Sequence, residues 1–174
     1  MYWLSLSKLN NQMLKLIVIL NAIFTKLFKM HHNLLLADDD NDDCAFFKEA
    51  LEELPISATL ITVNDGVQLM DFLSAKCDSL PDALFLDLNM PRKSGFECLS
   101  EIKLIDKLKD LPVVIFSTSL NMEVVDLLYQ KGAHYYIRKP GGYNNLKKAI
   151  LAAVTLVSKN KLTQPTRDKF ILHP

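Results

Sequence analysis

The sequence predicts an α/β fold: a doubly wound, five-stranded parallel sheet with five helices. Five short apolar runs alternate with five longer segments whose apolar residues recur at helical spacing. Strands that alternate with helices form right-handed crossover units, which place the strands in one parallel sheet covered on both faces. The central run, 84–86, ends abruptly in Asp87, and a loop marked by Pro91 follows. Because ligands collect at the carboxyl edge of such a sheet, Asp87 is the first candidate for a functional residue.

The predicted strands are short, and turn-forming residues bound most of them. Pro81 precedes the central strand, Pro112 precedes the fourth, and a turn at 64–66 follows the second. Each run is apolar enough to be buried inside a parallel sheet. The strands are predicted over 34–37, 59–63, 84–86, 113–116 and 135–137.

The predicted helices carry one apolar face each and end at recognisable stop signals. The first has apolar residues at helical spacing from Phe47 to Leu54 and stops at Pro55, and the acidic run 38–43 before it supplies N-cap candidates. Gly132 is a suitable capping residue for the end of the fourth helix. The remaining helices are predicted over 67–76, 96–105, 122–131 and 143–157.

The chain divides into an N-terminal extension (1–30), one globular domain (31–158) and a C-terminal tail (159–174). The extension has an apolar core at 16–20 that Asn21 interrupts, which is too short for a membrane span of about 20 residues. No small-residue cleavage site follows it. Three interpretations stay open: a segment upstream of a working start at Met30, an amphipathic helix docked on the domain or a membrane surface, and an anchor or signal. We expect the tail to be flexible or docked on the surface.

Composition excludes several classes of partner. The chain has 20 basic and 20 acidic residues, so its formal charge is zero and predicts no general attraction to nucleic acid or to an anionic membrane. Cys44, Cys77 and Cys98 are odd in number and lack paired spacing. This pattern suits reduced thiols in a cytoplasmic protein better than a disulfide framework or a zinc site.

Polar side chains follow four of the five predicted strands. Asp38 and Asp39 end the first strand, Asp87 the third and Ser117 the fourth, while Lys139 follows the fifth. Taken singly, each has a simple structural explanation: a helix cap, a turn acid or a solvated charge. Their coincidence at one edge of one sheet favours a functional site instead.

The charges in this cluster predict a cation. Unit charges about 4 Å apart near a protein surface interact by roughly 4 kcal/mol at an effective dielectric constant of 20, so three clustered carboxylates would repel one another or take up a proton. A divalent cation relieves the repulsion, and a set of oxygen ligands without His or Cys suits Mg²⁺. Lys139 and Ser117 would suit a phosphoryl group on Asp87, which points to acyl-phosphate chemistry.

Four segments carry a resemblance to a known family. Residues 35–39, 85–91, 116–118 and 136–140 resemble the four signatures of the response regulator receiver family, of which the chemotaxis protein CheY is a familiar single-domain member. The match covers about residues 33 to 157, in order. The resemblance implies a flavodoxin-like (CheY-like) fold and a role in a two-component phosphorelay.

The resemblance also implies a donor and a metal site. Asp87 would accept a phosphoryl group from a phosphohistidine on a sensor histidine kinase or on a histidine phosphotransfer protein. Mg²⁺ would be held by Asp39, Asp87 and the main-chain carbonyl of Asn89, with Asp38 assisting through water.

The same resemblance assigns three further residues. Lys139 would contact the phosphoryl group and precede a cis bond to Pro140. Ser117 and Tyr136 would form the conformational switch, with the tyrosine ring entering space that the serine vacates. Output would be binding to a downstream protein, and a homodimer through the fourth helix, fifth strand and fifth helix is a further option.

A second class of function also uses a phosphorylated aspartate with Mg²⁺. Mg²⁺-dependent phosphotransferases and phosphatases with an aspartate nucleophile commonly use Asp-x-Asp, in which the second acid protonates the leaving group. Here that position is Asn89, and the sequence offers no cap domain to hold a small substrate. The sequence therefore favours a signalling receiver, not an enzyme beyond its own phosphorylation and dephosphorylation.

Overall fold

The computed structural model describes residues 13, 31–76, 79–159 and 163–173 of the 174-residue chain. Apart from Met13, the predicted N-terminal extension lies outside the described residues, as does Cys77. The chain forms two compact units, the first of residues 1–31 with 55–57 and the second of residues 32–54 with 58–174. In the described part of the first unit, His31 Nδ1 and Ser57 Oγ form a hydrogen bond of 2.8 Å. The second unit holds the sheet and the features discussed below.

The sheet confirms the doubly wound parallel architecture and has one strand more than predicted. Its order is β2-β1-β3-β4-β5-β6, and the pairs β1–β3, β3–β4, β4–β5 and β5–β6 are all parallel. The order reverses between β1 and β3, which makes the carboxyl ends of these two strands the expected ligand crevice. The strands are β1 (His31–Ala37), β2 (Ser57–Val63), β3 (Ala83–Leu86), β4 (Val113–Ser117), β5 (Tyr135–Arg138) and β6 (Ile171–Leu172).

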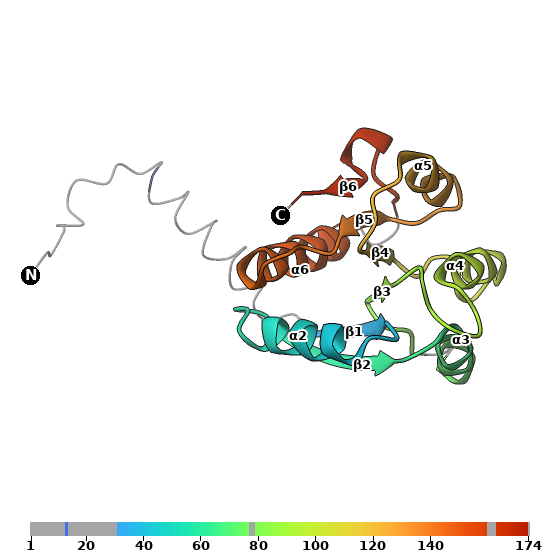
Figure 1. Cartoon of the computed structure of the whole chain (residues 1–174), viewed down its shortest axis with the longest axis horizontal. Coiled ribbons are helices and arrows are strands. Elements are labelled where there is room, and N and C mark those ends of the chain that lie inside the picture. The colour runs from blue at the N-terminus through green and yellow to red at the C-terminus, as the bar shows by residue number, and fades with distance from the viewer. Residues whose placement is uncertain (1–12, 14–30, 77–78, 160–162, 174) are drawn as a thin grey trace, which may run out of the picture. The chain divides into compact units, whose positions relative to one another are not determined.

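Five α-helices join the strands in the part of the chain that the structure describes. Helices α2 and α6 lie on one face of the sheet and α3, α4 and α5 on the other (Figure 1). Short polar side chains begin them: Asp40 caps α2, Asp65 caps α3, and Ser94 with Glu97 forms a capping box on α4. Their bounds are α2 (Asn41–Glu52), α3 (Gly66–Ala75), α4 (Gly95–Leu104), α5 (Met122–Gln130) and α6 (Tyr143–Lys159).

Alternate residues of the buried strands supply two separate core layers. Phe85 of β3 and Phe116 of β4 pack edge-on against Phe47 of α2, with ring centroids 4.9 Å (Phe47–Phe85) and 5.7 Å (Phe47–Phe116) apart. Leu84 and Leu86 belong to the apolar core on the other face. The two layers immobilise the strands on both faces, so the positions of the strand ends are set by packing.

The sixth strand corrects the predicted five-stranded sheet. The tail forms a 3₁₀ turn, η2 (Arg167–Lys169), and then β6, and Phe170 between them is completely buried. The backbone N–H of Tyr136 donates to the carbonyl of Phe170 at 2.9 Å. The Gln164 amide donates to the carbonyl of Tyr129 in the last turn of α5 and to that of Ala133 beyond the helix. The tail is therefore docked, which was one of the two predicted options. Its strand was missed because two residues are too few for a periodic pattern.

Within the described residues, no helix is both long enough and apolar enough to span a lipid bilayer.

Candidate functional site

The carboxyl ends of β1 and β3 bring the predicted acidic residues together. Asp38 follows β1, and its backbone N–H donates to the carbonyl of Val63 at 3.0 Å. Asp87 follows β3, and its N–H donates to the carbonyl of Ala37 at 2.9 Å. These backbone hydrogen bonds continue the sheet ladder one residue past the strands, so both aspartates start from rigid positions.

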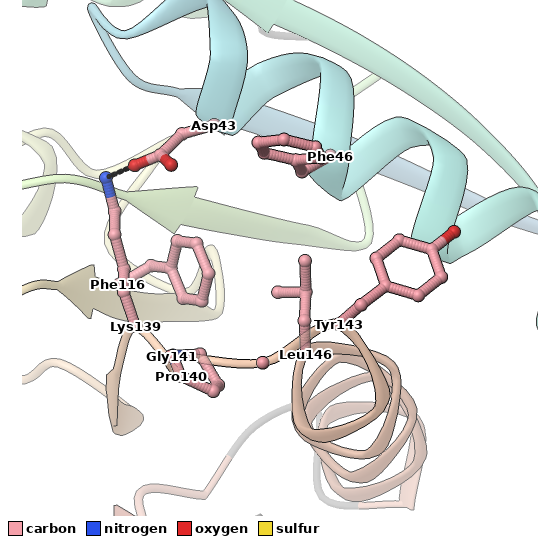
Figure 2. A pocket seen from close by; sticks show the side chains of 9 residues that line it. Asp43, Phe46, Phe116, Lys139, Pro140, Gly141, Tyr143 and Leu146 are labelled. Carbon is pink, nitrogen blue, oxygen red and sulfur yellow. Dashed lines mark hydrogen bonds and ion pairs between the residues drawn. The ribbon is translucent and has the colours of Figure 1, made fainter.

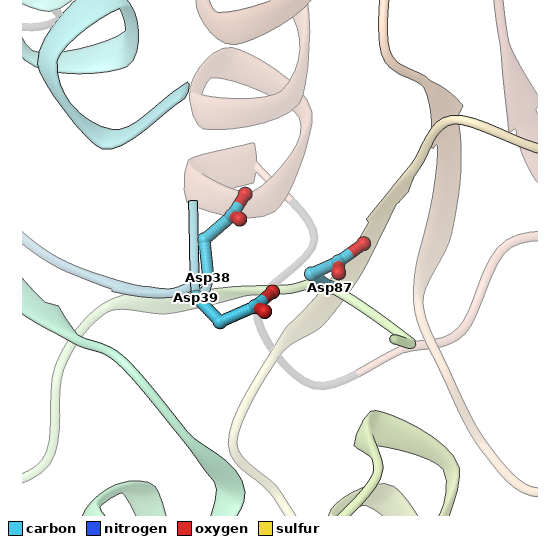
Figure 3. Close-up of side chains that lie close together, drawn as sticks. All are labelled: Asp38, Asp39 and Asp87. Carbon is cyan, nitrogen blue, oxygen red and sulfur yellow. The ribbon is translucent and has the colours of Figure 1, made fainter. Parts of the chain in front are cut away.

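Three carboxylates form the centre of the site. One oxygen each of Asp38, Asp39 and Asp87 lies within 4.8 Å of the other two, and Figure 3 shows the three side chains gathered at this edge of the sheet. Asp38 is completely buried and Asp87 is 5% exposed, whereas Asp39 is open to solvent. A ligand at this point would reach two buried acids from the side on which Asp39 lies.

Burial makes the ionised state of the two inner acids costly. It raises the pKa of Asp38 above its ordinary value, although the ammonium group of Lys139 acts in the opposite direction. Burial likewise raises the pKa of Asp87, against the effect of Lys139. Both carboxylates are therefore less well solvated than free aspartate, which is the condition in which a cation binds them strongly.

Lys139 supplies the positive charge at the site. Its Nζ lies 2.7 Å from Asp38 Oδ2, 2.7 Å from Asp43 Oδ2 and 3.8 Å from Asp87 Oδ1. Burial disfavours its charge, but hydrogen bonds to Asp38 and Asp43 and the charge of Asp87 outweigh that effect, so the pKa of Lys139 is raised. The ammonium group therefore bridges acids from two elements and approaches Asp87 without a hydrogen bond.

The loop between β3 and α4 holds Asn89 beside the acidic centre. The backbone N–H of Asn89 donates to Asp87 Oδ2 at 3.1 Å, and that of Gly95 donates to the carbonyl of Leu88 at 3.0 Å. A Cβ on Gly95 would lie 2.0 Å from the carbonyl oxygen of Asp87, so only glycine fits this close approach. The end of the loop at Gly95 therefore packs directly against the backbone of Asp87.

A second contact fixes this loop from the side. Among the residues that the structure describes, Arg92 is the one non-glycine residue with a positive φ (64°). Its guanidinium group forms an ion pair with the buried carboxylate of Asp65 at the start of α3. The motif around Asp87 predicts the loop, but it does not predict the ion pair between Arg92 and Asp65. Arg92 and Asp65 are far apart in the sequence, and neither shows a special spacing.

Ser117 ends β4, and Tyr136 lies in the neighbouring strand β5. Ser117 is completely buried, and its Oγ has no hydrogen-bond partner among the described residues. The Tyr136 hydroxyl lies near Ser117 but donates to the carbonyl of Ser119 at 2.6 Å. The ring of Tyr136 is fully buried in this structure.

The predicted cis bond before Pro140 is wrong. No cis peptide bond occurs among the residues that the structure describes, so the Lys139–Pro140 bond is trans. The trans form is favoured by about 0.5–1 kcal/mol for X–Pro bonds, and nothing in the sequence sets that preference aside here.

Sequence reasoning missed Asp43 as part of the site. Asp43 lies in the first turn of α2, where the sequence pattern indicates only a helix-cap candidate. Its side chain also borders a cavity of about 360 Å³ between α2 and the start of α6, lined by Phe46, Phe116, Lys139 and Tyr143 among others (Figure 2). One signal could have found it: α2 begins at the same sheet edge as the strand ends, so its first turn faces the site.

The donor set fits a divalent cation. Three carboxylates (Asp38, Asp43 and Asp87) lie within 4 Å of the ammonium group of Lys139, and Asp39 adds a fourth at the strand ends, so negative charge is in excess. The three at the strand ends offer oxygen atoms at the spacing of a shared ligand, and hard cations such as Mg²⁺ and Mn²⁺ prefer oxygen.

Comparison with known proteins agrees with this geometry. The sequence model of the response regulator receiver domain family matches residues 34–151 of this chain. The response regulator Rcp1 of a Synechocystis species is 34% identical over 121 residues, which cover 67% of this chain and 82% of Rcp1. A methanogenesis regulatory protein, FilR2 of Methanothrix harundinacea, is 30% identical over 67% of this chain and 77% of its own length.

Solved structures of receivers resemble the whole described fold. The phosphorylated cyanobacterial phytochrome response regulator RcpA superposes with a TM-score of 0.64 at 31% identity, covering 79% of this chain and 98% of RcpA. The Mn²⁺-bound form of Rcp1 superposes with a TM-score of 0.62 at 32% identity, covering 78% and 99%. The chain therefore belongs to the response regulator receiver family and is a receiver domain of a two-component signalling system.

Proposed function

We propose that Asp87 accepts a phosphoryl group and that this modification changes the binding of a partner protein. The observation that carries the proposal is the acidic centre: a nearly buried carboxylate at a strand end, with two further acids and one ammonium group within reach. That a solved relative is a phosphorylated response regulator supports the same chemistry. Asn89, in place of a second acid two residues after Asp87, argues against the alternative of an aspartate-nucleophile phosphotransferase or phosphatase.

The transfer step follows from the chemistry of the carboxylate. An oxygen of Asp87 attacks the phosphorus of a phosphohistidine, a new O–P bond forms, and the N–P bond breaks. The electron pair of that bond returns to the imidazole nitrogen, which takes a proton from solvent. The product on this chain is an acyl phosphate, whose hydrolysis by water would restore Asp87 and release inorganic phosphate.

The residues of the site divide the remaining work. Asp39, Asp87 and the carbonyl of Asn89 would hold Mg²⁺ directly, with Asp38 assisting through water. Bound Mg²⁺ would neutralise charge on the phosphoryl oxygens. Lys139, 3.8 Å from Asp87, needs only a small displacement to contact a phosphoryl group there.

Ser117 is the residue best placed to report the modification. Its buried Oγ has no hydrogen-bond partner among described residues, and satisfying such a group is favourable by about 1–3 kcal/mol. A phosphoryl oxygen on Asp87 would provide the acceptor, and Tyr136, whose hydroxyl is bonded to the Ser119 carbonyl, would respond to the shift. We infer that the switch is a change of hydrogen-bond partners around a buried ring.

The remaining assignments rest on the family. The phosphoryl donor would be a sensor histidine kinase or a histidine phosphotransfer protein, and the output an unidentified protein, with a homodimer through α5, β5 and α6 as an option. We assign residues 31–158 to the receiver, 1–30 to an extension and 159–174 to an appended tail. A cytoplasmic location suits these partners and the free thiols of Cys44 and Cys98.

Phosphorylation by acetyl phosphate with Mg²⁺ tests the proposal. Wild type should gain one acid-stable, base-labile group by intact-mass spectrometry, and Asp87→Asn should gain none. Asp71→Asn, a matched change on the exposed side of α3, should behave like wild type. Labelling of Asp87→Asn at the wild-type rate would refute the assignment.

A further inference from the structure

Lys139 is shared between acids of different origin. Asp38 and Asp87 belong to the strand ends, whereas Asp43 comes from the first turn of α2 and approaches the ammonium group from the cavity side (Figure 2). Both Asp38 and Asp43 lie 2.7 Å from Nζ, but the proposed acceptor Asp87 lies 3.8 Å away. The ammonium group is thus hydrogen-bonded to Asp43 and not to Asp87.

A cavity leaves space on one side of the Lys139 side chain. Its Nζ lies over the ring of Phe116, 5.6 Å from the centroid, beside the cavity that Asp43 borders. The following Gly141 and Gly142 have no neighbour within 4 Å of where a Cβ would stand. Because the cavity leaves one side of the ammonium group unpacked, the ion pairs of Lys139 help to set its position.

We propose that Asp43 is a positioning residue for Lys139. It draws the ammonium group outward, toward α2, and so leaves Asp87 less neutralised than a direct ion pair would. The acceptor carboxylate then keeps its charge for the cation, and Lys139 stays within a short distance of the phosphoryl position. This inference rests on the proposed metal and phosphoryl site and adds a residue to it.

The proposal predicts that removing Asp43 weakens Mg²⁺ binding, although Asp43 is not one of the proposed metal ligands. Without the charge of Asp43, Lys139, which already lies 2.7 Å from Asp38, would move toward Asp87. There it would neutralise the oxygens that a cation needs. Mg²⁺ affinity should therefore fall through the displaced ammonium group, beyond the small effect of losing one nearby negative charge.

Calorimetric titration of Mg²⁺ into the full chain measures this effect. Asp43→Asn should weaken binding about two- to fivefold, the range expected for a partly exposed ion pair. The matched control is Asp42→Asn, which removes the same charge from the same helix turn at an exposed residue that forms no ion pair with Lys139. Asp43→Glu, which keeps the charge, should bind Mg²⁺ more tightly than Asp43→Asn.

A double-mutant cycle separates positioning from simple charge. Lys139→Gln alone should strengthen Mg²⁺ binding, and in that background Asp43→Asn should weaken binding no more than Asp42→Asn does. The ¹⁵N–¹H signal of the Lys139 ammonium group gives a second readout, since Asp43→Asn should shift it and Asp42→Asn should not. Thermal unfolding of each variant establishes that it is folded before titration.

The outcomes are distinguishable. If wild type binds no Mg²⁺, the proposed metal site fails and this inference fails with it. If wild type binds Mg²⁺ but Asp43→Asn and Asp42→Asn weaken binding equally, only the role of Asp43 is wrong. The same conclusion follows if the effect of Asp43→Asn persists in full in the Lys139→Gln background.

Discussion

Two regions that adjoin β5 differ in how their residues affect the stability of the folded chain. Beyond the carboxyl end of this strand, Lys139 joins a cluster of acids that are buried at a cost, and this cost is visible in the raised pKa values of Asp38 and Asp87. Along its outer edge, β6 and the buried ring of Phe170 add packing without any charge. The acidic cluster has the properties of a ligand site, whereas β6 and Phe170 contribute packing that stabilises the fold. Substitutions in the two should therefore change the free energy of unfolding in opposite directions.

The largest effect is expected at Phe170. Its ring is fully buried and packs edge-on against Tyr129 with centroids 5.2 Å apart, so Phe170→Ala should lower the free energy of unfolding by about 3–5 kcal/mol. Chemical denaturation checks this value. Phe46→Ala, at a ring 53% exposed, is the control and should cost far less. A small loss at Phe170 would mean that the tail leaves the sheet readily.

A buried histidine, His134, directly before β5 gives the next effect. Burial, with a smaller contribution from Lys103, lowers the pKa of His134 to about 4, against 6.5 ordinarily. The unfolded chain therefore binds more protons between these values. The neutral imidazole of His134 therefore contributes its full share of the unfolding free energy above pH 6.5. This contribution is lost as the pH falls toward 4, by about 3 kcal/mol in all.

Comparing variants isolates this titration. The acids at the site act with the opposite sign, because their raised pKa values favour the folded state at low pH. The measured quantity is thus the difference in unfolding free energy between wild type and His134→Asn, followed from pH 7 to pH 4. The difference should change across that window. A difference independent of pH would show that His134 is protonated equally in both states.

Removing charge from the site should stabilise the protein in the absence of metal. Asp87→Asn removes a charge that burial disfavours and relieves repulsion with Asp39, while losing part of the attraction of Lys139, so we expect a gain of about 1–2 kcal/mol in unfolding free energy. Asp71→Asn should stay within about 0.5 kcal/mol of wild type. Excess Mg²⁺ should narrow the gap between wild type and Asp87→Asn. Destabilisation by Asp87→Asn would contradict the contrast between the two regions.

The smallest effect in energy concerns signal output. Ser117→Ala should still accept phosphate, more slowly, but show a smaller change in partner affinity on phosphorylation, because the buried hydroxyl can no longer bond a phosphoryl oxygen. Such bonds are worth a few kcal/mol, whereas moving a population from 1:99 to 99:1 takes about 5.5 kcal/mol. An unchanged affinity difference in both Ser117→Ala and Tyr136→Ala would end the switch assignment.

The contrast also explains what the sequence could and could not predict. The strands, helices and gathering of Asp38, Asp87 and Lys139 followed from periodicity and from the rule that parallel strands end at one edge. The burial of Phe170 was not predicted, because the strand that follows it has only two residues and shows no period. Tyr136, whose N–H donates to the Phe170 carbonyl, is 34 residues away along the chain. Asp43 escaped because a helix cap and an ion-pair partner look alike in sequence.

Trapping the acyl phosphate tests the central claim most directly. Wild-type protein is phosphorylated with acetyl phosphate and Mg²⁺, reduced with borohydride, digested and sequenced by mass spectrometry. Borohydride converts an aspartyl phosphate to homoserine, so the modified position is read without a substitution. The account predicts homoserine in place of Asp87 and at no other aspartate. Homoserine at Asp38, Asp39 or Asp43, or none in protein shown to be phosphorylated, would contradict it.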